Sequence, residues 1–438
     1  MSLFDHIPAF SIEDAIHFAQ EFYRLQVQAT ALPSERDQNF LLQADNGNQF
    51  VLKIANATEE RSMLEAQNQV MQHLANYVQF CPRVIPTLNG EEIIAVESAS
   101  GERHFLRLVT YLRGTPLGNV KRHSPELLQD LGFKVGEVNK ALRNFDHPAL
   151  HRDFHWDLAN GPDILQRYEA LIQESELRQL IRRFRAQFEH DVTPLLPALP
   201  RSIVHNDANN FNLLAGGGDD LYSCNQNIVG LIDFGDMVYS YAISDLAVAI
   251  AYAILDKPDP LAIAAQILKG YYAACPLTEH ELAALFGLVT LRLCMSACIA
   301  ADQQSRQPDN KYLGVSQAAI RTTLPKLAAI HPNFARAVFR EACGLSPFPG
   351  QVAEWLKSHT DDFASPIGFD LRTAPLAMID LSIASPLFSS DPLQNDEPYL
   401  TPRIFQAIQA AGATLGIGRY NEARYIYIAP AFATGAQP

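Results

Sequence analysis

The sequence predicts an α+β protein with a strand-rich first part, a helical middle part and a C-terminal α/β appendage. Three observations predict this class. Short apolar runs flank a turn at residues 45–48, apolar residues recur at helical spacing between about residues 125 and 302, and shorter runs of both kinds follow residue 333. We therefore expect three regions, at residues 1–113, 114–332 and 333–438.

The first region is predicted to be a small antiparallel sheet with two helices. Ser11 suits the N-cap of the first helix because its hydroxyl can accept a backbone hydrogen bond, and Asp14 stands three residues later. Gly47 can take the positive φ that a tight hairpin turn requires. The expected elements are a helix at 11–26, strands at 40–44 and 50–54, a helix at 58–77, and strands at 93–96 and 105–111.

The character of the chain changes after residues 113–116. Amphipathic stretches then dominate, and we expect helices at 125–145, 162–174, 177–193, 243–255, 260–275 and 278–302. The last region shows a helical stretch at 400–411 and two strand-like apolar runs at 377–383 and 425–429. It is therefore predicted to form a separate α/β segment.

The composition predicts a cytoplasmic protein that acts on small molecules. Its 34 Lys and Arg against 48 Asp and Glu give a net charge of −14, which argues against nucleic acid or an anionic membrane as a partner. The first residues lack the basic and apolar segments of a secretory signal. The longest apolar run, at 242–255, is too short to span a bilayer and contains Asp245.

Two apolar runs end in side chains that suit phosphoryl transfer. One leads into a His-Asn-Asp motif ending at Asp207, with Asn212 five residues later, and the other leads into an Asp-Phe-Gly-Asp motif starting at Asp233. Phosphoryl transfer needs a carboxylate that orients the acceptor hydroxyl, and oxygens that hold the metal. We assign Asp207 the first role. We assign Asn212 and Asp233 to Mg²⁺, which favours oxygen ligands. Alternatively, Asp207 and Asn212 only cap turns.

Candidate nucleotide-binding residues lie in the first region. Lys53 ends a hairpin strand, where a lysine reaches the α- and β-phosphates and pairs with a helix carboxylate, here Glu65 or else Glu60. The phosphate-covering turn is expected at 32–40, although it lacks the usual glycines. In that turn Arg36 either contributes a cation or pairs with Asp37. The remaining candidates are Ser34 and Asn39 in the turn and Thr110, Tyr111 and Leu112 in the hinge.

Carboxylates beyond those that hold the metal are candidates for an ammonium group on the acceptor. Asp236 either supports the metal site or anchors such a group. Asp153 or Asp157 offers a further carboxylate, and Trp156 between them offers a cation–π face. In the alternative interpretation, Trp156 is a core residue and the flanking Asp residues cap helices.

These motifs, together with those at 35–40, 51–56, 156–158 and 205–212, resemble the aminoglycoside phosphotransferase and choline kinase superfamily, and within it the hydroxylysine kinases. The resemblance implies a bilobal protein-kinase-like fold with a small antiparallel-sheet N-lobe and a helical C-lobe. It further implies transfer of the γ-phosphate of ATP or GTP to the hydroxyl of an amino alcohol or hydroxy-amino acid. Ser34 departs from the pattern, since relatives are expected to carry glycine there.

Two other functions fit the same sequence. One is an antibiotic kinase of the aminoglycoside phosphotransferase type, and the other is a pseudokinase that serves as a docking module. Lys53, Asp207, Asn212 and Asp233 argue against the second, because all are intact. The stretch at 417–424 resembles the connector of bacterial fusion proteins that carry a peptidase-like module and a class III aminotransferase. We therefore expect downstream fused domains or a homo-oligomer as partners of the last region.

Overall fold

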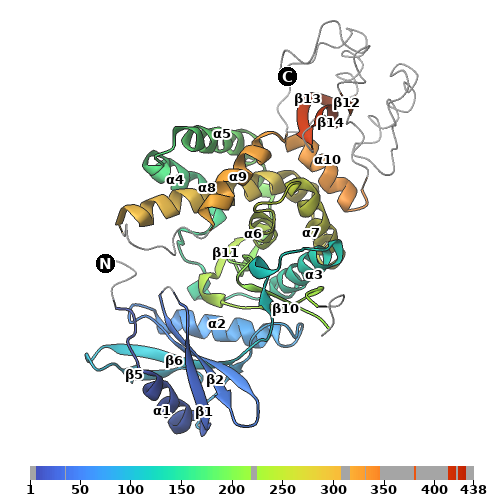
Figure 1. Ribbon diagram of the computed structural model, residues 1–438. Coiled ribbons are helices and arrows are strands. Elements are labelled where there is room, and N and C mark those ends of the chain that lie inside the picture. The colour runs from blue at the N-terminus through green and yellow to red at the C-terminus, as the bar shows by residue number, and fades with distance from the viewer. Residues whose placement is uncertain are drawn as a thin grey trace, which may run out of the picture. The chain divides into compact units, whose positions relative to one another are not determined.

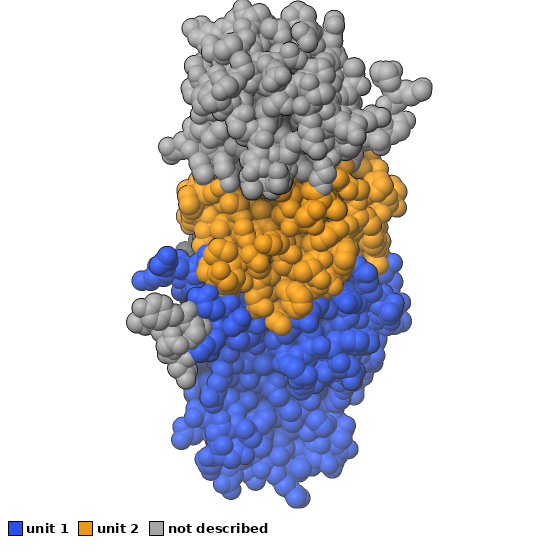
Figure 2. All heavy atoms as spheres, turned by 90° about the vertical axis from the view of Figure 1, so that its right-hand side faces the viewer, with its two compact units in different colours: residues 1–123, 137–153, 202–239 blue, residues 124–136, 154–201, 240–438 orange. Residues whose placement is uncertain are grey.

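The computed structural model describes residues 6–34, 36–218, 224–306, 316–330, 332–345, 379–380, 413–420 and 423–430. The chain divides into two compact units (Figures 1 and 2). Unit 1 comprises residues 1–123, 137–153 and 202–239, and unit 2 comprises residues 124–136, 154–201 and 240–438. The strand-rich and helical parts confirm the α+β class. The expected three-part division stays a prediction.

Unit 1 is built on a six-stranded antiparallel sheet in the order β1-β2-β3-β6-β4, with β5 paired to β6. The hairpin between β2 and β3 forms at the expected turn, where Gly47 has φ +82° and its amide donates to the Ala44 carbonyl. The strands are β1 (Val27–Leu32), β2 (Gln38–Ala44), β3 (Gln49–Ile54), β4 (Val84–Ile85), β5 (Ile94–Glu97) and β6 (Arg103–Thr110).

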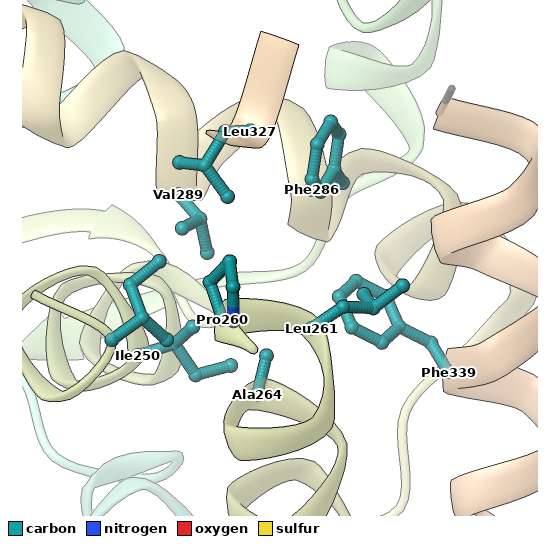
Figure 3. A pocket seen from close by; sticks show the side chains of 9 residues that line it. Ile250, Pro260, Leu261, Ala264, Phe286, Val289, Leu327 and Phe339 are labelled. Atoms are coloured by element: carbon teal, nitrogen blue, oxygen red, sulfur yellow. The ribbon is translucent and has the colours of Figure 1, made fainter. Parts of the chain in front are cut away.

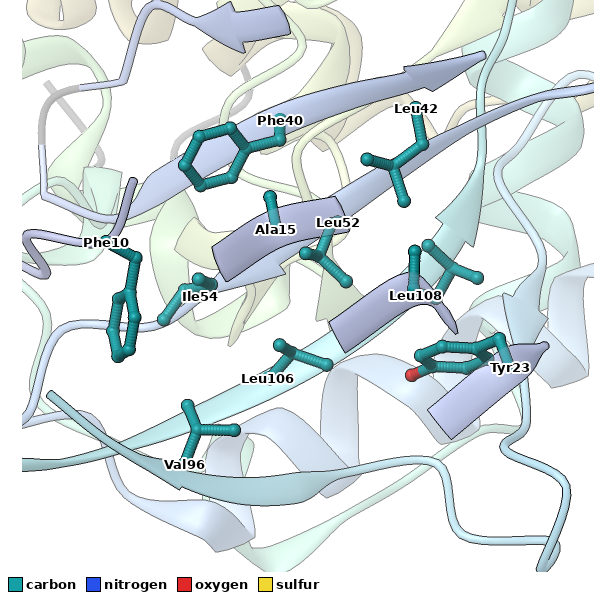
Figure 4. Packing of buried hydrophobic residues seen from close by; sticks show 11 residues of the cluster. Phe10, Ala15, Tyr23, Phe40, Leu42, Leu52, Ile54, Val96, Leu106 and Leu108 are labelled. Atoms are coloured by element: carbon teal, nitrogen blue, oxygen red, sulfur yellow. The ribbon is translucent and has the colours of Figure 1, made fainter. Parts of the chain in front are cut away.

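Helix α1 (Ile12–Tyr23) covers this sheet. Its N-terminus carries the expected capping box, in which the Asp14 amide donates to the Ser11 hydroxyl and the Ser11 amide donates to the Asp14 carboxylate. Ala15 is fully buried, so that the helix backbone approaches the strands closely, and Tyr23 packs on the same side. Figure 4 shows both beside the sheet core, which consists of Phe40, Leu42, Leu52, Ile54, Val96, Leu106 and Leu108.

Helix α2 (Arg61–Leu74) is shorter than the expected 58–77. Before it, the Asn56 side-chain oxygen accepts from the amide and the hydroxyl of Thr58. This local turn competes with helix formation, and the helix therefore begins three residues later than expected. The turn also fixes the chain where it leaves β3.

The motif-bearing strands of unit 1 form smaller sheets. One has the order β10-β9-β7, and β8 pairs with β11. The β9–β10 pairing shifts register between Ile228 and Gly230. The bounds are β7 (Thr115–Pro116), β8 (Arg201–Val204), β9 (Leu213–Gly216), β10 (Asn227–Leu231) and β11 (Val238–Tyr241). Short 3₁₀ helices are η1 (Leu117–Asn119), η2 (Pro148–Leu150), η3 (Leu158–Asn160), η4 (Glu169–Leu171), η5 (Thr193–Ala198) and η6 (Phe234–Asp236).

Unit 2 is mainly helical, as the sequence predicts. Its helices, with α3 continuing into unit 1, are α3 (Pro125–Leu142), α4 (Gly161–Tyr168), α5 (Ser175–Asp191), α6 (Ser244–Ala253), α7 (Pro260–Ala274), α8 (Glu279–Arg306), α9 (Gln317–Ala328) and α10 (Pro332–Ala342). Every residue of α6 is buried. Helix α8 is long and apolar enough to cross a membrane, but 89% of its most apolar window is buried inside the protein. This burial is typical of a core helix.

Helices α3 and α7 touch backbone to backbone. A Cβ atom added to Gly132 would lie 1.8 Å from the Ile267 carbonyl oxygen, and one added to Gly270 would lie 1.8 Å from the Gln129 carbonyl oxygen. Nearby, a small hollow in the helical core is lined by apolar side chains such as Leu261, as Figure 3 shows. Apolar walls of this kind cannot pair the charges of a phosphate or an ammonium group.

The last region contributes three described strands, β12 (Ile379–Asp380), β13 (Ala413–Tyr420) and β14 (Ala423–Pro430), in the order β12-β14-β13. Strand β14 contains the expected run at 425–429, and β12 lies within the expected run at 377–383. The expected helix at 400–411 lies outside the described residues.

Helix α10 should be needed for the stability of unit 2. Phe334 and Phe339 are 4% and 1% exposed, and Arg336 and Arg340 form ion pairs with Glu279 of α8. Loss of one buried Phe side chain costs about 3–5 kcal/mol. A chain that ends at residue 332 should therefore unfold at a lower temperature than a chain that ends at residue 345, as calorimetry can measure. Equal melting temperatures would show that α10 packs without stabilising the unit.

Candidate active site

Two loops of unit 1 carry the predicted catalytic and metal-binding residues, and they are joined through His205. The 205–212 loop connects β8 to β9, and the 232–237 loop follows β10. The Asp207 amide donates to His205 Nδ1 over 3.3 Å, which leaves the proton on Nε2, and Nε2 donates to the Ile232 carbonyl over 3.1 Å. The Ile232 amide in turn donates to the Asn212 carbonyl. The buried imidazole thus joins the two loops through hydrogen bonds.

Asp207 is held by two amide side chains. Asn209 Nδ2 donates to its Oδ1 over 2.9 Å, and Asn212 Nδ2 donates to its Oδ2 over 2.7 Å. The turn itself is capped by Asn209, whose Oδ1 accepts from the backbone amides of Phe211 and Asn212. Asp207 is therefore a fixed hydrogen-bond acceptor, and another residue supplies the turn cap that the alternative interpretation assigned to it.

The donor set of the two loops fits a hard divalent cation. Because the Asn212 NH₂ group donates to Asp207, the Asn212 oxygen is the atom that remains to act as a ligand. The Asp233 side chain is 55% exposed and supplies carboxylate oxygens. Among the described residues no group of three or more His, Cys, Asp and Glu side chains could hold a metal ion. A cation bound by Asn212 and Asp233 would therefore draw its other ligands from phosphate or water oxygens, as Mg²⁺ commonly does.

Asp233 has an unusual backbone and an ion-pair partner. Its φ of 66° and ψ of 81° lie in the left-handed region, which side-chain-bearing residues adopt only when their surroundings hold them there. Lys53 Nζ lies 3.4 Å from Asp233 Oδ1. Lys53, and secondarily Arg36, lower the pKa of Asp233 to about 2, although partial desolvation acts in the opposite direction. Asp233 is therefore ionised at every physiological pH.

The expected partnership of Lys53 with helix α2 is not formed. Among the described residues neither Glu65 nor Glu60 pairs with Lys53, and Glu65 instead binds Arg61 over 2.8 Å at i,i+4 spacing. This spacing favours a pair within one helix. Helix α2 contacts the sheet through Gln67 and Asn68, whose side-chain oxygens accept from the buried Arg107 guanidinium.

The phosphate-covering turn contributes Arg36 to the 232–237 loop. Arg36 Nη2 lies 2.8 Å from Asp236 Oδ1, so the structure favours Asp236 over Asp37 as its ion-pair partner. Ser34 is exposed beside Glu35, which lies outside the described residues, and Asn39 lies opposite Lys53 in the β2–β3 register. Arg36 and Lys53 are therefore the two cations of this turn and hairpin that adjoin the 232–237 loop.

In the expected hinge, residues 110–112, most backbone amides already form hydrogen bonds within the chain. The Thr110 amide donates to the Arg83 carbonyl, its hydroxyl accepts from the Arg83 amide, and the Tyr111 amide donates to the Gln49 carbonyl. The Leu112 amide has no hydrogen-bond partner within the described part of the chain. Leu112 is therefore the residue of this segment whose N–H could bind a nucleotide base.

The four residues expected to bind the acceptor are divided between the two units. Asp236 and the exposed Asp153 belong to unit 1, whereas Trp156 and Asp157 belong to unit 2. Asp157 is 5% exposed and caps η3 by accepting from the Ala159 amide, as the alternative interpretation held.

Trp156 already has a cation on its ring. The Arg292 guanidinium lies 4.6 Å from the ring centroid and also donates to the Trp156 carbonyl. Arg292 is 1% exposed. This contact favours a structural role for Trp156, because a buried arginine supplies the positive charge that an acceptor ammonium was expected to bring.

Sequence reasoning missed Glu59, Arg107 and Arg152. Arg152 donates to the carbonyls of Gly235 and Met237 and so contacts the 232–237 loop directly. Desolvation and the nearby Asp37 raise the pKa of Glu59, which lies among arginines that include Arg36. No local spacing links these residues to the motifs, because these side-chain interactions join segments that are distant in the sequence.

The chain belongs to the phosphotransferase enzyme family. The family model matches residues 28–285, which include Lys53, Asp207, Asn212 and Asp233. The chain is also 33% identical over 328 residues to the hydroxylysine kinase of Xenopus laevis, an alignment that covers 70% of this chain and 87% of that protein. It is therefore a kinase that phosphorylates an alcohol group, and this confirms the class expected from the motifs.

Solved structures confirm the kinase-like fold. An amicoumacin kinase in complex with AMP-PNP, Ca²⁺ and Ami matches with a TM-score of 0.55 at 16% identity, over 72% of this chain and 93% of that chain. A microcompartment-associated aminopropanol kinase matches with a TM-score of 0.54 at 17% identity, over 80% of this chain and 98% of that chain. Phosphoryl transfer in this family depends on a nucleotide, as the complex with AMP-PNP illustrates.

Asp207→Ala should abolish most turnover and leave nucleotide binding nearly unchanged. The loss of a positioned acid–base group costs about 10²- to 10⁴-fold in rate. Asp233→Ala should weaken metal–nucleotide binding as well, because Asp233 adjoins Lys53. Steady-state kinetics and calorimetric nucleotide titration separate the two effects, with exposed Asp45→Ala as the control. Near-normal turnover of Asp207→Ala would refute the assignment.

Lys53→Met should remove an acid-sensitive part of the stability. The folded pKa of Asp233, about 2, lies below the unfolded value of about 3.9, so the contribution is fully present above that value and disappears as the pH falls toward 2. The loss of unfolding free energy in Lys53→Met should therefore shrink between about pH 6 and pH 3 in urea titrations. Exposed Lys140→Met in α3 is the control. A pH-independent loss would contradict the pairing.

Proposed function

We propose that the chain phosphorylates the hydroxyl of a small amine-bearing alcohol or hydroxy-amino acid, with hydroxylysine as the leading candidate, and uses Mg²⁺ with ATP or GTP. The observation that carries the proposal is the 33% identity to a hydroxylysine kinase across 87% of that protein. A fold shared with an aminopropanol kinase adds support, because that name also describes an amino alcohol.

In the proposed reaction Asp207 aligns the acceptor hydroxyl and takes its proton late. The two Asn side chains that hold the Asp207 carboxylate fix its direction, so binding already sets the geometry that the transition state needs. Lys53 exchanges Asp233 for a phosphate oxygen. A bound metal ion would supply charge neutralisation at the phosphates, held by Asn212 and Asp233.

Two of the carboxylates considered for the acceptor's ammonium group already have partners in the folded chain. Asp236 already pairs with Arg36, and Asp157 already caps η3. Asp153 also has an interaction within the chain, but its exposed side chain can be reached by a ligand, and it stays our candidate for this contact. The aminoglycoside alternative has less support, since the solved antibiotic kinases resemble this chain in fold at 16% identity or below.

We further propose a cytoplasmic location and an adaptor role for residues 333–438, toward a downstream fused domain or a second copy of the chain. This proposal rests on the resemblance of the 417–424 stretch and on the strands β13 and β14 that contain it. Helix α10, at the start of this region, packs against α7 and α8 and also contacts β14.

A coupled kinase assay over hydroxylysine, ethanolamine, choline, homoserine and aminoglycosides, each with ATP and with GTP, tests the proposal. We expect the highest kcat/KM for hydroxylysine, and a loss of about 10²- to 10⁴-fold in Asp207→Ala with the same acceptor. Neutral hydroxy acids of equal length serve as controls for the ammonium group. A higher kcat/KM for an aminoglycoside would favour the antibiotic-kinase alternative, and equal values for neutral acids would refute an ammonium-bearing acceptor.

A further inference from the structure

Two arginines from distant segments hold the 232–237 loop at consecutive residues. Arg36, which precedes β2, binds the Asp236 carboxylate over 2.8 Å. Arg152, which follows η2, donates from Nη2 to the Gly235 carbonyl over 2.8 Å and from Nε to the Met237 carbonyl over 3.1 Å. The contacted positions, 235–237, begin two residues after Asp233, the proposed metal ligand.

The contact between Arg36 and Asp236 is largely shielded from water. The Arg36 and Asp236 side chains are 32% and 16% exposed. A charge-assisted hydrogen bond is stronger in such surroundings than on the open surface. Arg152 is also desolvated, which lowers the pKa of its guanidinium, while Asp236 and Glu59 act against this effect. The three side chains therefore form a charged cluster that fixes the loop.

The loop needs such support because of its backbone. Asp233 has a left-handed conformation with φ 66°, which is unfavourable for a residue with a side chain and persists only when the surrounding structure imposes it. On the N-terminal side the loop is held by the hydrogen bonds of Ile232 with His205 and Asn212. On the C-terminal side the contacts of Arg36 and Arg152 supply the matching restraint.

We propose that Arg36 and Arg152 are positioning residues that clamp the 232–237 loop, with Asp236 as the anchor for Arg36, and thereby set the Asp233 carboxylate for its metal ion. This inference rests on the proposed metal-binding role of Asp233. It gives Asp236 a supporting role in the metal site. It also links the phosphate-covering turn to the 232–237 loop, because Arg36 belongs to the turn and binds Asp236 in the loop.

The test compares Arg36→Gln, Arg152→Gln, Arg152→Lys and Asp236→Asn by Mn²⁺ binding in the presence of non-hydrolysable ATP and GTP analogues. Electron paramagnetic resonance reports bound Mn²⁺ without requiring turnover. Loss of a residue that orients a metal ligand typically weakens the metal affinity roughly 10- to 100-fold. We expect that range for Arg36→Gln, Arg152→Gln and Asp236→Asn, and a partial recovery in Arg152→Lys. The Arg36→Gln/Asp236→Asn double variant should bind Mn²⁺ no more weakly than the weaker single variant.

Arg182→Gln is the matched control. Arg182 and Arg185 hold the Glu169 carboxylate in unit 2 over 3.0 and 3.4 Å, so the change removes one arginine from a comparable cluster. It should leave Mn²⁺ affinity at the wild-type value. If Arg152→Gln fails to fold, as judged by circular dichroism, Arg36→Gln and Asp236→Asn decide the question.

Two outcomes would overturn the clamp. Mn²⁺ affinities in Arg36→Gln and Asp236→Asn that equal the wild-type value would mean that the loop needs neither residue. Weaker nucleotide binding in Arg36→Gln with normal binding in Asp236→Asn would mean that Arg36 acts on phosphate directly. If the unmutated chain binds Mn²⁺ and nucleotide but phosphorylates none of the acceptors, the proposed function is refuted. The Mn²⁺-binding test of the clamp is still valid in that case.

Discussion

The site depends on one buried imidazole. His205 is fully buried, and its two nitrogens are committed, one as an acceptor from the Asp207 amide and the other as a donor to the Ile232 carbonyl. Only the neutral ring satisfies both contacts, since a protonated ring would face the Asp207 amide with a second donor. The ring also packs edge-on against Phe234, with centroids 4.8 Å apart. One side chain therefore joins the loop that carries Asp207, the proposed catalytic carboxylate, to the loop that carries Asp233, the proposed metal ligand.

Contacts of Asn212 and Lys53 add to this arrangement. Asn212 reaches Asp207 through its amide group and Ile232 through its carbonyl, so the two loops are joined at both ends of the 205–212 segment. Lys53 then connects the sheet to Asp233. The links from Asn212 to Ile232 and from Lys53 to Asp233 join different segments of the chain, whereas Asn212 and Asp207 lie in one loop. The chemistry of the site is thus built from the same bonds that stabilise its loops.

The sequence predicted those parts of the fold that local rules determine. The Ser11 capping box, the turn at Gly47 and the helices expected between residues 125 and 302 follow from short patterns, and all are present, whereas α9 and α10 were not predicted. The motif residues Lys53, Asp207, Asn212 and Asp233 also fall within unit 1.

The partnerships between charged side chains were harder to predict. Glu65 was expected to reach Lys53, but Arg61 lies four residues away on the same helix and binds it. Arg36 had Asp37 as a sequence neighbour, yet its partner is 200 residues away. The role of Arg152 could not be predicted because its acceptors are backbone carbonyls, which every residue carries. Several cationic side chains and carboxylates lie near one another in the folded chain, and its three-dimensional packing determines which of them form pairs.

Arg107 contributes a buried positive charge that no hydrogen-bonded carboxylate among the described residues neutralises. Its buried guanidinium is held by the neutral side chains of Gln67 and Asn68, so its charge is not cancelled by a bonded anion. The field of that charge reaches Asp37, Asp233 and Glu59, which counter the desolvation that lowers its pKa. Under the proposed function, a polyphosphate that enters the site would replace carboxylates as the anion near this fixed positive charge. A chain with a net charge of −14 can in this way admit a highly charged anion without first gathering free cations from solution.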